Sequence, residues 1–267
     1  DTGPCGPCSE IFYDHGDHIP GGPPGSPDED GDRFIEIWNL VFMQFEQVSL
    51  TERIGLPKPS IDTGMGLERC ASTLQGVLSN FEIDTLKPLC QAAGEIVGAK
   101  YEYSAPEGRA LRRIADHVRA CSFALHEGCG PGPEKENYIV RLLLRRAAME
   151  GFLLGKKQPF LHGLVPAIVE GMKAQYPEIT QTMKSVADVI KAEEEQFLDV
   201  VDRGLPRFEK LAQRAKSSGG VISGYWAIGS TRAAAFDLSA ACSGFAYAYA
   251  VAHGFITAGL GTRALVI

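Results

Sequence analysis

The chain has 267 residues, of which 45% are hydrophobic and 22% are charged, and its formal net charge at pH 7 is −7. This length allows two domains with a sizeable core, and the composition is that of an ordinary soluble globular protein, not of a disordered or fibrous one. Because the chain is acidic overall, any contact with nucleic acid must come from a local cluster of cations.

The cysteines and the hydropathy pattern bear on location. The seven Cys residues follow no regular framework, and the chain shows neither a signal peptide nor an apolar run of membrane-spanning length. We therefore expect a reducing cytoplasmic location and no membrane association. The chain starts with Asp1 and ends in the apolar run 264–267, so both ends look truncated.

Residues 1–32 are dense in Gly, Pro and Asp, which predicts a long loop. In this loop Cys5 and Cys8 precede His15 and His18, and two thiolates with two imidazoles would complete a tetrahedral zinc shell. Only six residues separate the second Cys from the first His, which is tight for four ligands. Solvated loop residues are therefore favoured over a metal site, and we assign no metal ligand.

Residues 34–45 (FIEIWNLVFMQF) predict a strand, because they are rich in β-branched and aromatic side chains. Apolar residues on both faces are typical of a central strand covered by other elements. Asn39 and Val41 point to one face of an ideal strand, and Glu36 points to the other. Glu36 and Asn39 therefore line one site only if a bulge lies between them or a ligand wraps an edge. Taken alone, Asn39 is more typical of a satisfied polar group in a strand.

Residues 56–69 (LPKPSIDTGMGLER) predict a rigid segment with two prolines, followed by a glycine-spaced turn and the start of a helix. Gly64 and Gly66 remove side chains where a ligand can approach the backbone. Asp62 supplies a fixed negative charge, and Arg69 supplies a cation in the first turns of the helix. A Gly-x-Gly spacing alone is more typical of an ordinary strand-to-helix connection, so the flanking residues decide.

From about residue 81 the pattern becomes helical. Residues 107–125 and 138–154 predict amphipathic helices, and residues 177–216 predict a long polar helix whose acidic run at 193–195 we assign no chemistry. The arginines of the first two helices form a local cation cluster suited to phosphate contacts, although any isolated pair is more typical of a solvated helix face. These arginines are Arg109, Arg112, Arg113, Arg119, Arg141, Arg145 and Arg146.

Three motifs together resemble the alanyl-tRNA synthetase family in their order and spacing. They are residues 3–11 (GPCGPCSEI), the strand at 34–45 and residues 57–69 (PKPSIDTGMGLER). The resemblance continues through residues 113–119 (RIADHVR) and ends near residue 224.

The resemblance implies an α+β fold. Residues 1–90 would be the C-terminal part of a class II synthetase catalytic domain with an antiparallel sheet, and residues 91–224 a helical tRNA-recognition domain. The implied activity is that of an alanine-tRNA ligase, in which ATP activates alanine as alanyl-adenylate and the alanyl group passes to tRNA(Ala). Catalysis would then be mainly positioning and electrostatics.

The resemblance also assigns roles to particular residues. Alanine binding is assigned to Asn39, Val41, Asp62 and Gly64. ATP binding, with Mg²⁺, is assigned to Glu36, Gly66 and Arg69. Contacts with tRNA are assigned to Arg112, Arg113, Arg119, Asn137, Arg141, Arg145 and Arg146. Asp62 would bind the ammonium of alanine, Arg69 the phosphates, and Glu36 either magnesium or the adenosine.

The chain departs from the family pattern in two places. The family's first two motifs, with the arginine that grips ATP, should lie upstream of Asp1, so we expect the chain not to activate alanine by itself. The family also presents an Asn in the turn before its Tyr-Val-Leu-Arg helix, whereas residues 131–138 read PGPEKENY. Pro133 occupies that position, and Asn137 is a candidate to replace the recognising group.

Residues 225–267 belong to a different pattern. Residues 233–245 (AAAFDLSAACSGF) predict a buried strand that runs into Cys242 at a strand-helix elbow, where a helix N-terminus favours the thiolate. From about residue 228 the segment resembles the nucleophile region of the type III β-ketoacyl-acyl-carrier-protein synthases, and we expect a truncated thiolase-like strand-helix-strand piece. The family's His and Asn partners would lie beyond Ile267, so condensation is not expected. Two partial families in one chain suggest a chimeric reading frame.

Three classes of function follow from these patterns. The leading hypothesis is a fragment of an alanine-tRNA ligase. The alternatives are an acyl-transfer or condensing enzyme fragment that uses Cys242 and a non-catalytic helical module that binds tRNA.

Overall fold

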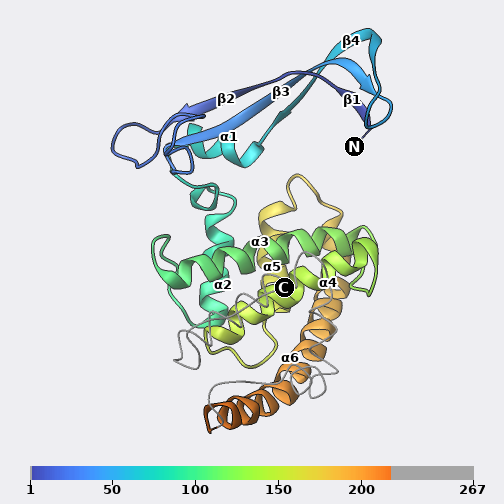
Figure 1. Ribbon diagram of the computed structural model, residues 1–267. Helices are drawn as coiled ribbons and strands as arrows, with labels where there is room; N and C mark the ends of the chain where they lie inside the picture. Colours follow the sequence, from blue (N-terminus) through green and yellow to red (C-terminus); the bar gives the residue numbers. More distant parts are fainter. Residues whose placement is uncertain (1, 218–267) are drawn as a thin grey trace. The chain divides into compact units, whose positions relative to one another are not determined.

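The computed structural model describes residues 2–217. They form two compact units: unit 1 holds the described residues of Asp1–Glu95 and Lys100–Ala115, and unit 2 those of Ile96–Ala99 and Asp116–Ile267. The expected α+β class is confirmed, because an antiparallel sheet is followed along the chain by helices (Figure 1). The expected ketoacyl-synthase-like piece, with Cys242, lies outside the described residues.

Unit 1 contains an antiparallel sheet organised around one long strand, β3 (Phe34–Gln47). The strands β1 (Gly3–Cys5) and β2 (Cys8–Asp14) pair with successive parts of one edge of β3. The strand β4 (Arg53–Met65) pairs with the other edge. The strand predicted at 34–45 is therefore present, two residues longer than expected, and it is central within the described sheet.

The prediction of a loop over residues 1–32 is wrong for two segments. The structure places β1 and β2 there, because the backbone of both segments bonds to the edge of β3. Between them Pro7 supplies a carbonyl to the amide N–H of Phe42 at 2.9 Å, so the pairing continues across the turn formers. Gly and Pro raised the turn propensity of these segments, but pairing with a long neighbouring strand overrode it.

A β-bulge on β3 decides which residues share a face of the sheet. Ile11 pairs with Trp38 while the next residue of β2, Phe12, pairs with Glu36, so Ile37 is the extra residue. A bulge shifts the alternation of faces by one residue. Glu36 therefore lies on the same face as Asn39. The sequence analysis requires such a bulge if the two residues are to line one site.

The second irregularity of the sheet lies in β4. Met43 pairs with Ser60 and Phe45 with Gly55, so residues 56–59 (LPKP) bulge out of the ladder. Two of these four residues are prolines, which have no N–H to donate to β3. After the bulge the pairing resumes through Met65, so Asp62 and Gly64 lie in a strand and the turn predicted there is wrong.

The rest of unit 1 is helical. The helix α1 (Leu67–Leu74) follows Gly66, whose N–H donates to the carbonyl of Ile37 at 3.3 Å. A short 3-10 helix η1 (Asn80–Glu82), the helix α2 (Lys87–Val97) and the first half of α3 (Pro106–His126) follow. The buried side chains of this unit lie among these helices and include Ile83, Leu89, Cys90, Leu111 and Ile114.

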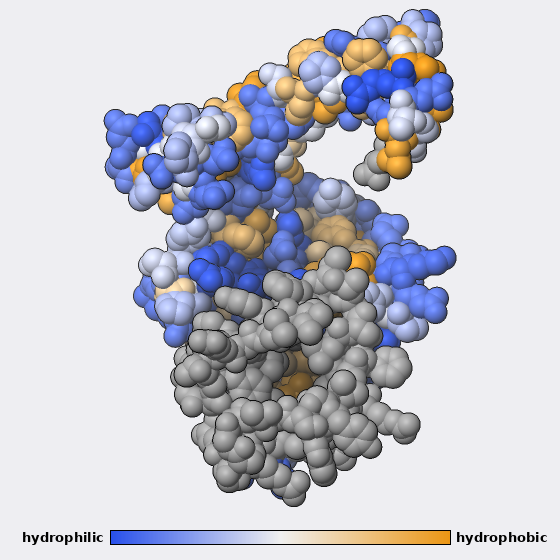
Figure 2. Space-filling model, viewed as in Figure 1, coloured by the Kyte–Doolittle hydropathy of each residue, from blue (hydrophilic) through white to orange (hydrophobic). Residues whose placement is uncertain are grey.

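The sheet itself is largely open. None of the described residues of β3 is buried, and β4 is exposed along nearly all of its length. The expectation of a strand covered on both faces is therefore wrong for this structure. Apolar residues appear in orange on the surface of the strands in Figure 2, and Ile54, Ile61 and Met65 are each more than half exposed.

Unit 2 is helical in its described part. It contains the second half of α3, the helix α4 (Lys135–Leu153), the 3-10 helix η2 (Leu161–Leu164), and the helices α5 (Val165–Met172) and α6 (Ile179–Ser217). The helices predicted at 107–125, 138–154 and 177–216 are confirmed as α3, α4 and α6. The core is apolar, and its fully buried members include Val118, Leu144, Leu161, Ile168 and Ile190.

The acidic run of α6, to which the sequence assigns no chemistry, is partly buried. Glu193 is 4% exposed and Glu194 is 1% exposed. The Glu194 carboxylate accepts the backbone N–H groups of Phe160 and Leu161, both at 2.9 Å. It thereby satisfies two donors that have no partner within their own helical turn.

No helix in the part of the chain that the structure describes is both long enough and apolar enough to cross a membrane.

We predict that Glu194 makes the stability of unit 2 depend on pH. Burial raises the pKa of Glu194 from 4.5 to about 7, and the two backbone hydrogen bonds only partly offset this. The folded state therefore retains a proton that the unfolded state loses, so stability falls as pH rises from about 4.5 to about 7. The loss is about 3 kcal/mol at most. Urea unfolding followed by circular dichroism at several pH values measures it.

The variant Glu194→Gln tests the assignment, because a neutral amide oxygen accepts the same two N–H groups at every pH. We expect its unfolding free energy to vary less over this pH window than that of the unchanged protein. The matched control is Glu178→Gln, an exposed carboxylate ahead of α6. An unchanged pH slope in Glu194→Gln would contradict the prediction.

Candidate functional site

One face of the sheet in unit 1 carries several polar residues from three strands. Residues that pair directly across antiparallel strands point to the same face, so the register assigns the face of each side chain. We call this the polar face. Its members include Cys8, Glu10, Glu36, Asn39, Val41, Asp62 and Gly64. The opposite face carries Ile11, Trp38, Leu40, Phe42, Ile61 and Met65.

The residues predicted to bind alanine therefore lie together. Val41 pairs with Asp62, and Asn39 pairs with Gly64, so the four residues form a block of two adjacent cross-strand pairs. A Cβ added at Gly64 would meet no atom within 4 Å, which leaves the space above Asn39 open for a ligand. Asp62 is exposed in this structure.

The side chain of Asn39 is held at both ends of its amide. Its Nδ2 donates to Oε1 of Glu10 at 3.0 Å, and its Oδ1 accepts from Sγ of Cys8 at 3.1 Å. Both partners come from β2, in the segment that the sequence predicts as a loop. Asn39 is therefore fixed by the neighbouring strand in the described structure.

The predicted ATP residues Glu36 and Arg69 are in contact. Nη1 of Arg69 donates to the backbone carbonyl of Glu36 at 2.8 Å and lies 3.4 Å from its carboxylate oxygen Oε2. Gly66 begins the helix that carries Arg69, and a Cβ at Gly66 would lie 3.3 Å from the Arg69 side chain. Because Gly66 has no side chain, Arg69 has room to turn back toward β3.

An open groove of about 430 Å³ adjoins this pair. Phe12, Phe34 and Glu36 contribute from the strands, and Arg69 contributes from α1. The remaining lining residues include Asp32, Ser79, Asn80, Phe81 and Tyr103. The groove therefore combines aromatic surfaces with a cation and two carboxylates, and it shares Glu36 with the polar face.

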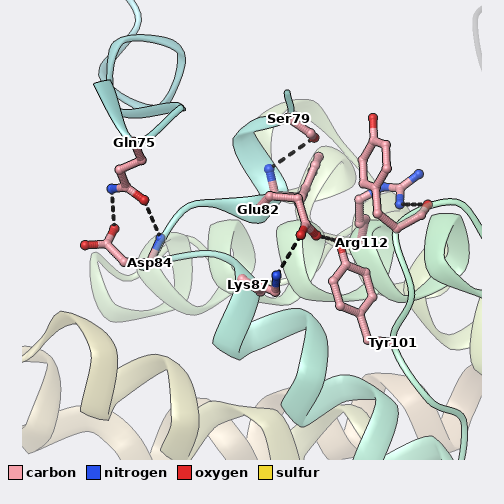
Figure 3. Close-up of polar contacts among 9 residues, drawn as sticks. Gln75, Ser79, Glu82, Asp84, Lys87, Tyr101 and Arg112 are labelled. Atoms are coloured by element: carbon pink, nitrogen blue, oxygen red, sulfur yellow. Dashed lines mark hydrogen bonds and ion pairs between the residues drawn. The ribbon is translucent and has the colours of Figure 1, made fainter. Parts of the chain in front are cut away.

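A polar network lies around η1, which contributes Asn80 and Phe81 to the groove, and Figure 3 shows its hydrogen bonds. Glu82 accepts hydrogen bonds from Nζ of Lys87 and the hydroxyl of Tyr101, both at 2.8 Å. Burial and the bond to Glu82 raise the pKa of Tyr101 above its usual range. The side chain of Gln75 is tied to Asp84 by two hydrogen bonds at 2.9 and 3.0 Å.

Arg112 belongs to this network. It donates to the backbone carbonyl of Tyr103 at 2.7 Å, and its guanidinium lies 4.4 Å from the centre of the Tyr103 ring (Figure 3). It also lies 5.9 Å from the ring of Phe81. Arg112 thus orders two aromatic residues of the groove wall, while its assignment to tRNA contact stays a prediction.

Two of the predicted tRNA residues of α4, Arg141 and Arg145, converge on one acidic residue in unit 2. Nε of Arg145 donates to Oε1 of Glu193 at 2.8 Å, and Nε of Arg141 lies 3.4 Å from the same oxygen. The Arg145 guanidinium also lies 5.8 Å from the ring of Phe197. The buried carboxylate thus holds two arginines and offsets part of their charge.

The other predicted tRNA residues are placed as follows. Arg119 lies 3.6 Å from Asp116, whose pKa is lowered chiefly by its hydrogen bond to His117 and further by Arg119. Nδ2 of Asn137 donates to the carbonyl of Gly130 at 2.6 Å and so closes the loop that contains Pro133. Arg113 is exposed on α3, and Arg146 is partly exposed on α4.

The Cys and His residues near the N-terminus do not form a metal site in the described structure. Cys5 pairs with Phe45 and Cys8 with Val41, four residues apart along β3. Both are free cysteines. No group of three or more His, Cys, Asp or Glu among the described residues is placed to hold a metal ion.

Sequence reasoning missed Cys8, Glu10 and the aromatic lining of the groove. The signal for β2 is the alternation in residues 8–14 (CSEIFYD), where Ile11 and Tyr13 alternate with polar neighbours. Tyr103 and Phe81 carry no such signal, because they meet the groove only through the tertiary fold.

One family model matches most of the chain. The family model described as class II tRNA synthetases (A) matches residues 1–229. The chain therefore belongs to this family of class II tRNA synthetases.

Similar proteins are named alanine–tRNA ligases. The chain is 53% identical to those of Caulobacter sp. (strain K31) and Stenotrophomonas maltophilia (strain K279a), over 224 residues in each case. It is 51% identical over 226 residues to that of Acidithiobacillus ferridurans. These alignments cover 83–84% of the chain and 25–26% of each relative, so the chain spans about a quarter of the length of the relatives it matches.

A second family model matches residues 236–267. It is described as 3-oxoacyl-[acyl-carrier-protein] synthase III, which agrees with the resemblance of the region around Cys242. The two matched ranges do not overlap. The residues of this second match lie outside the part of the chain that the structure describes.

We predict that Glu193 is needed for the stability of unit 2. Replacing it with Gln removes the charge that compensates Arg141 and Arg145, whose side chains are 27% and 17% exposed. We expect Glu193→Gln to lower the unfolding free energy by about 2 kcal/mol, somewhat less than for a fully buried pair. The control is Glu195→Gln, an exposed neighbour whose loss should cost less than about 0.5 kcal/mol. Equal urea midpoints for the two variants would refute this role.

Proposed function

We propose that the chain forms one wall of a site in which alanine and ATP react to give alanyl-adenylate. The observation that carries the proposal is the register of β3, which together with the bulge at Ile37 puts Glu36, Asn39, Asp62 and Gly64 on one face. The printed names of the relatives support the choice of alanine. The reaction and the substrates are proposals because the chain covers only a quarter of those relatives.

Alanine would lie over the block of Asn39, Val41, Asp62 and Gly64. The Asp62 carboxylate would accept hydrogen bonds from the ammonium group, and a charge-assisted bond of this kind is about twice as strong as a neutral one. The open space at Gly64 would admit the backbone of the amino acid. Val41 lies beside Asp62 and would limit the size of the side chain, because each extra methylene in such a pocket is worth about 1–3 kcal/mol.

ATP would occupy the groove between β3 and α1. Its aromatic lining suits a base, and Arg69 would bind phosphate oxygens and stabilise the charge that develops as pyrophosphate leaves. Glu36 and Asp32 are carboxylates of the kind that hold Mg²⁺ together with substrate phosphates, so the donor set fits that ion, which would neutralise phosphate charge when bound. Glu36 is equally placed to contact the adenosine part.

The chemical step would be positioned by this face. A carboxylate oxygen of alanine attacks the α-phosphorus of ATP, a phosphorus–oxygen bond forms, and the bond to the bridging oxygen breaks as pyrophosphate departs. In the second step a hydroxyl at the tRNA terminus attacks the alanyl carbonyl carbon and adenylate leaves. Glu36 joins the groove to the alanine block, so the two substrates would meet along β3.

The helical residues would contact tRNA(Ala). Arg141 and Arg145 are held together by Glu193 with part of their charge offset, and Arg146 adds a third cation on α4. Such an arrangement favours defined phosphate contacts over a diffuse positive field, because the arginine side chains are ordered before tRNA binds.

We predict that Asp62 dominates binding of alanyl-adenylate. The probe is the non-hydrolysable sulfamoyl analogue of alanyl-adenylate, titrated calorimetrically into the full chain. Asp62→Asn should weaken binding by about 2 kcal/mol, roughly thirtyfold, because the ammonium loses its charged acceptor. The control Asp30→Asn removes an exposed carboxylate from the loop before β3 and should bind as the unchanged chain does.

Activity can be tested by exchanging segments. Residues 1–224 replace the matching segment of the Caulobacter alanine–tRNA ligase, and ATP–pyrophosphate exchange is measured with alanine. The proposal expects exchange in the hybrid and its loss in the hybrid that carries Asp62→Asn. Unaltered exchange in the Asp62→Asn hybrid would remove this residue from the mechanism.

We also predict a measurable contribution of Arg146 to tRNA binding. Arg146→Gln should weaken binding of tRNA(Ala) to the full chain and reduce the slope of log K against log salt by about one. Lys173→Gln, an exposed cation that follows α5 and is paired with Glu170, is the control and should leave the slope unchanged. Identical slopes for both variants would contradict a phosphate contact by Arg146. Binding without any exchange in the hybrid would favour the non-catalytic alternative.

A further inference from the structure

Two residues of the polar face have no part in the proposed function, although both contact Asn39. They are Cys8 and Glu10, which lie two residues apart on β2 and point to the same face. We propose that Cys8 and Glu10 are positioning residues that fix the orientation of the Asn39 amide and thereby set how the alanine pocket recognises its ligand. This inference rests on the proposed function.

The two contacts define the amide uniquely. An amide carries a donor end and an acceptor end of nearly the same shape, so an isolated Asn side chain can turn over at little cost. The Glu10 carboxylate is an acceptor when ionised, so it bonds only to the Nδ2 end, at 3.0 Å. The Cys8 thiol donates to the Oδ1 end at 3.1 Å. Turning the amide over would face two acceptors against each other at Glu10.

The fixed amide leaves a defined pattern for a ligand. With one Nδ2 hydrogen given to Glu10 and one Oδ1 lone pair used by Cys8, Asn39 retains one N–H and one lone pair. Gly64 pairs with Asn39 and has no Cβ, so these remaining groups have space to meet a ligand. A ligand that matches the pattern bonds to both, whereas a mismatched one leaves a polar group unpaired, which costs about 1–3 kcal/mol.

The Cys8 thiol is available to donate this hydrogen bond because it forms no disulfide. Cys8 is a free cysteine, and so is Cys5. Ser9 lies between Cys8 and Glu10 and pairs with Leu40 on the opposite face. Ser9 therefore provides a matched control within the same strand.

The test uses the full chain and the sulfamoyl analogue of alanyl-adenylate. Five variants are titrated: Glu10→Gln, Cys8→Ala, Cys8→Ser, Ser9→Ala and Asp62→Asn. Gln can donate as well as accept, so Glu10→Gln relaxes the orientation, and Cys8→Ala removes the donor. Both should weaken binding about tenfold. Cys8→Ser keeps a donor and should stay within about threefold of the unchanged chain, as should Ser9→Ala.

Two further measurements distinguish an effect on ligand recognition from an effect on folding. Thermal unfolding should show equal midpoints for Cys8→Ala and Cys8→Ser, so that a difference in affinity cannot come from folding. The seryl analogue should lose less affinity than the alanyl analogue in Glu10→Gln, because a relaxed amide adapts to an added hydroxyl. A merely structural role for Glu10 would lower both affinities alike.

The outcomes separate the two proposals. If the unchanged chain binds the probe and Asp62→Asn does not, while Glu10→Gln and Cys8→Ala bind normally, the positioning role is overturned and the proposed function stands. Equal weakening in Cys8→Ala and Cys8→Ser also overturns the role of the thiol as donor. If the unchanged chain does not bind the probe, the proposed function falls and the positioning role falls with it.

Discussion

The central pairing of β3 is the constraint on which the sheet depends. Its two edges are occupied over residues 38–41 and 45–47, by β1 and β2 on one side and by β4 on the other. A slip of one residue would turn Asn39 and Asp62 to the apolar face. The bulge at Ile37 then corrects the alternation at one point, so that Glu36 joins the same face. The candidate site is therefore a property of register, and each of its residues depends on pairing that is remote in sequence.

In unit 2, two acidic side chains are buried in the core and do not lie on an open face of a sheet. Glu193 and Glu194 are buried; the first is compensated by two arginines, and the second accepts two backbone N–H groups that only partly offset the cost of its burial. Burying a carboxylate without such partners would cost several kcal/mol, on the order of what a domain has in total. These acids therefore fix how α6 meets α4 and the start of η2, and they give the arginines of α4 defined positions.

The sequence predicted the long elements well, since α3, α4 and α6 carry helical periodicity and β3 is rich in β-branched and aromatic residues. It missed β2 because Gly and Pro on either side outweighed a short alternation. It also missed the buried acids, although they continue the apolar stripe of Val186, Ile190 and Phe197 at helical spacing. The alanine and ATP residues were named from motif resemblance, but their shared face required the bulge at Ile37. No pattern in a single strand reveals an extra residue relative to its neighbour.

The exposure of Asp62 limits what alanine alone can gain at this site. Two unit charges 4 Å apart interact by about 1 kcal/mol in water and about 4 kcal/mol at an effective dielectric constant of 20. For an ammonium that binds to the open polar face, the interaction energy is close to the value in water. A ligand that also fills the groove at Glu36 and Arg69 covers more of this face and displaces water from it, which moves the interaction energy toward the larger value. The joined adenylate should therefore bind far more tightly than free alanine, and the nucleotide would strengthen the recognition of the amino acid.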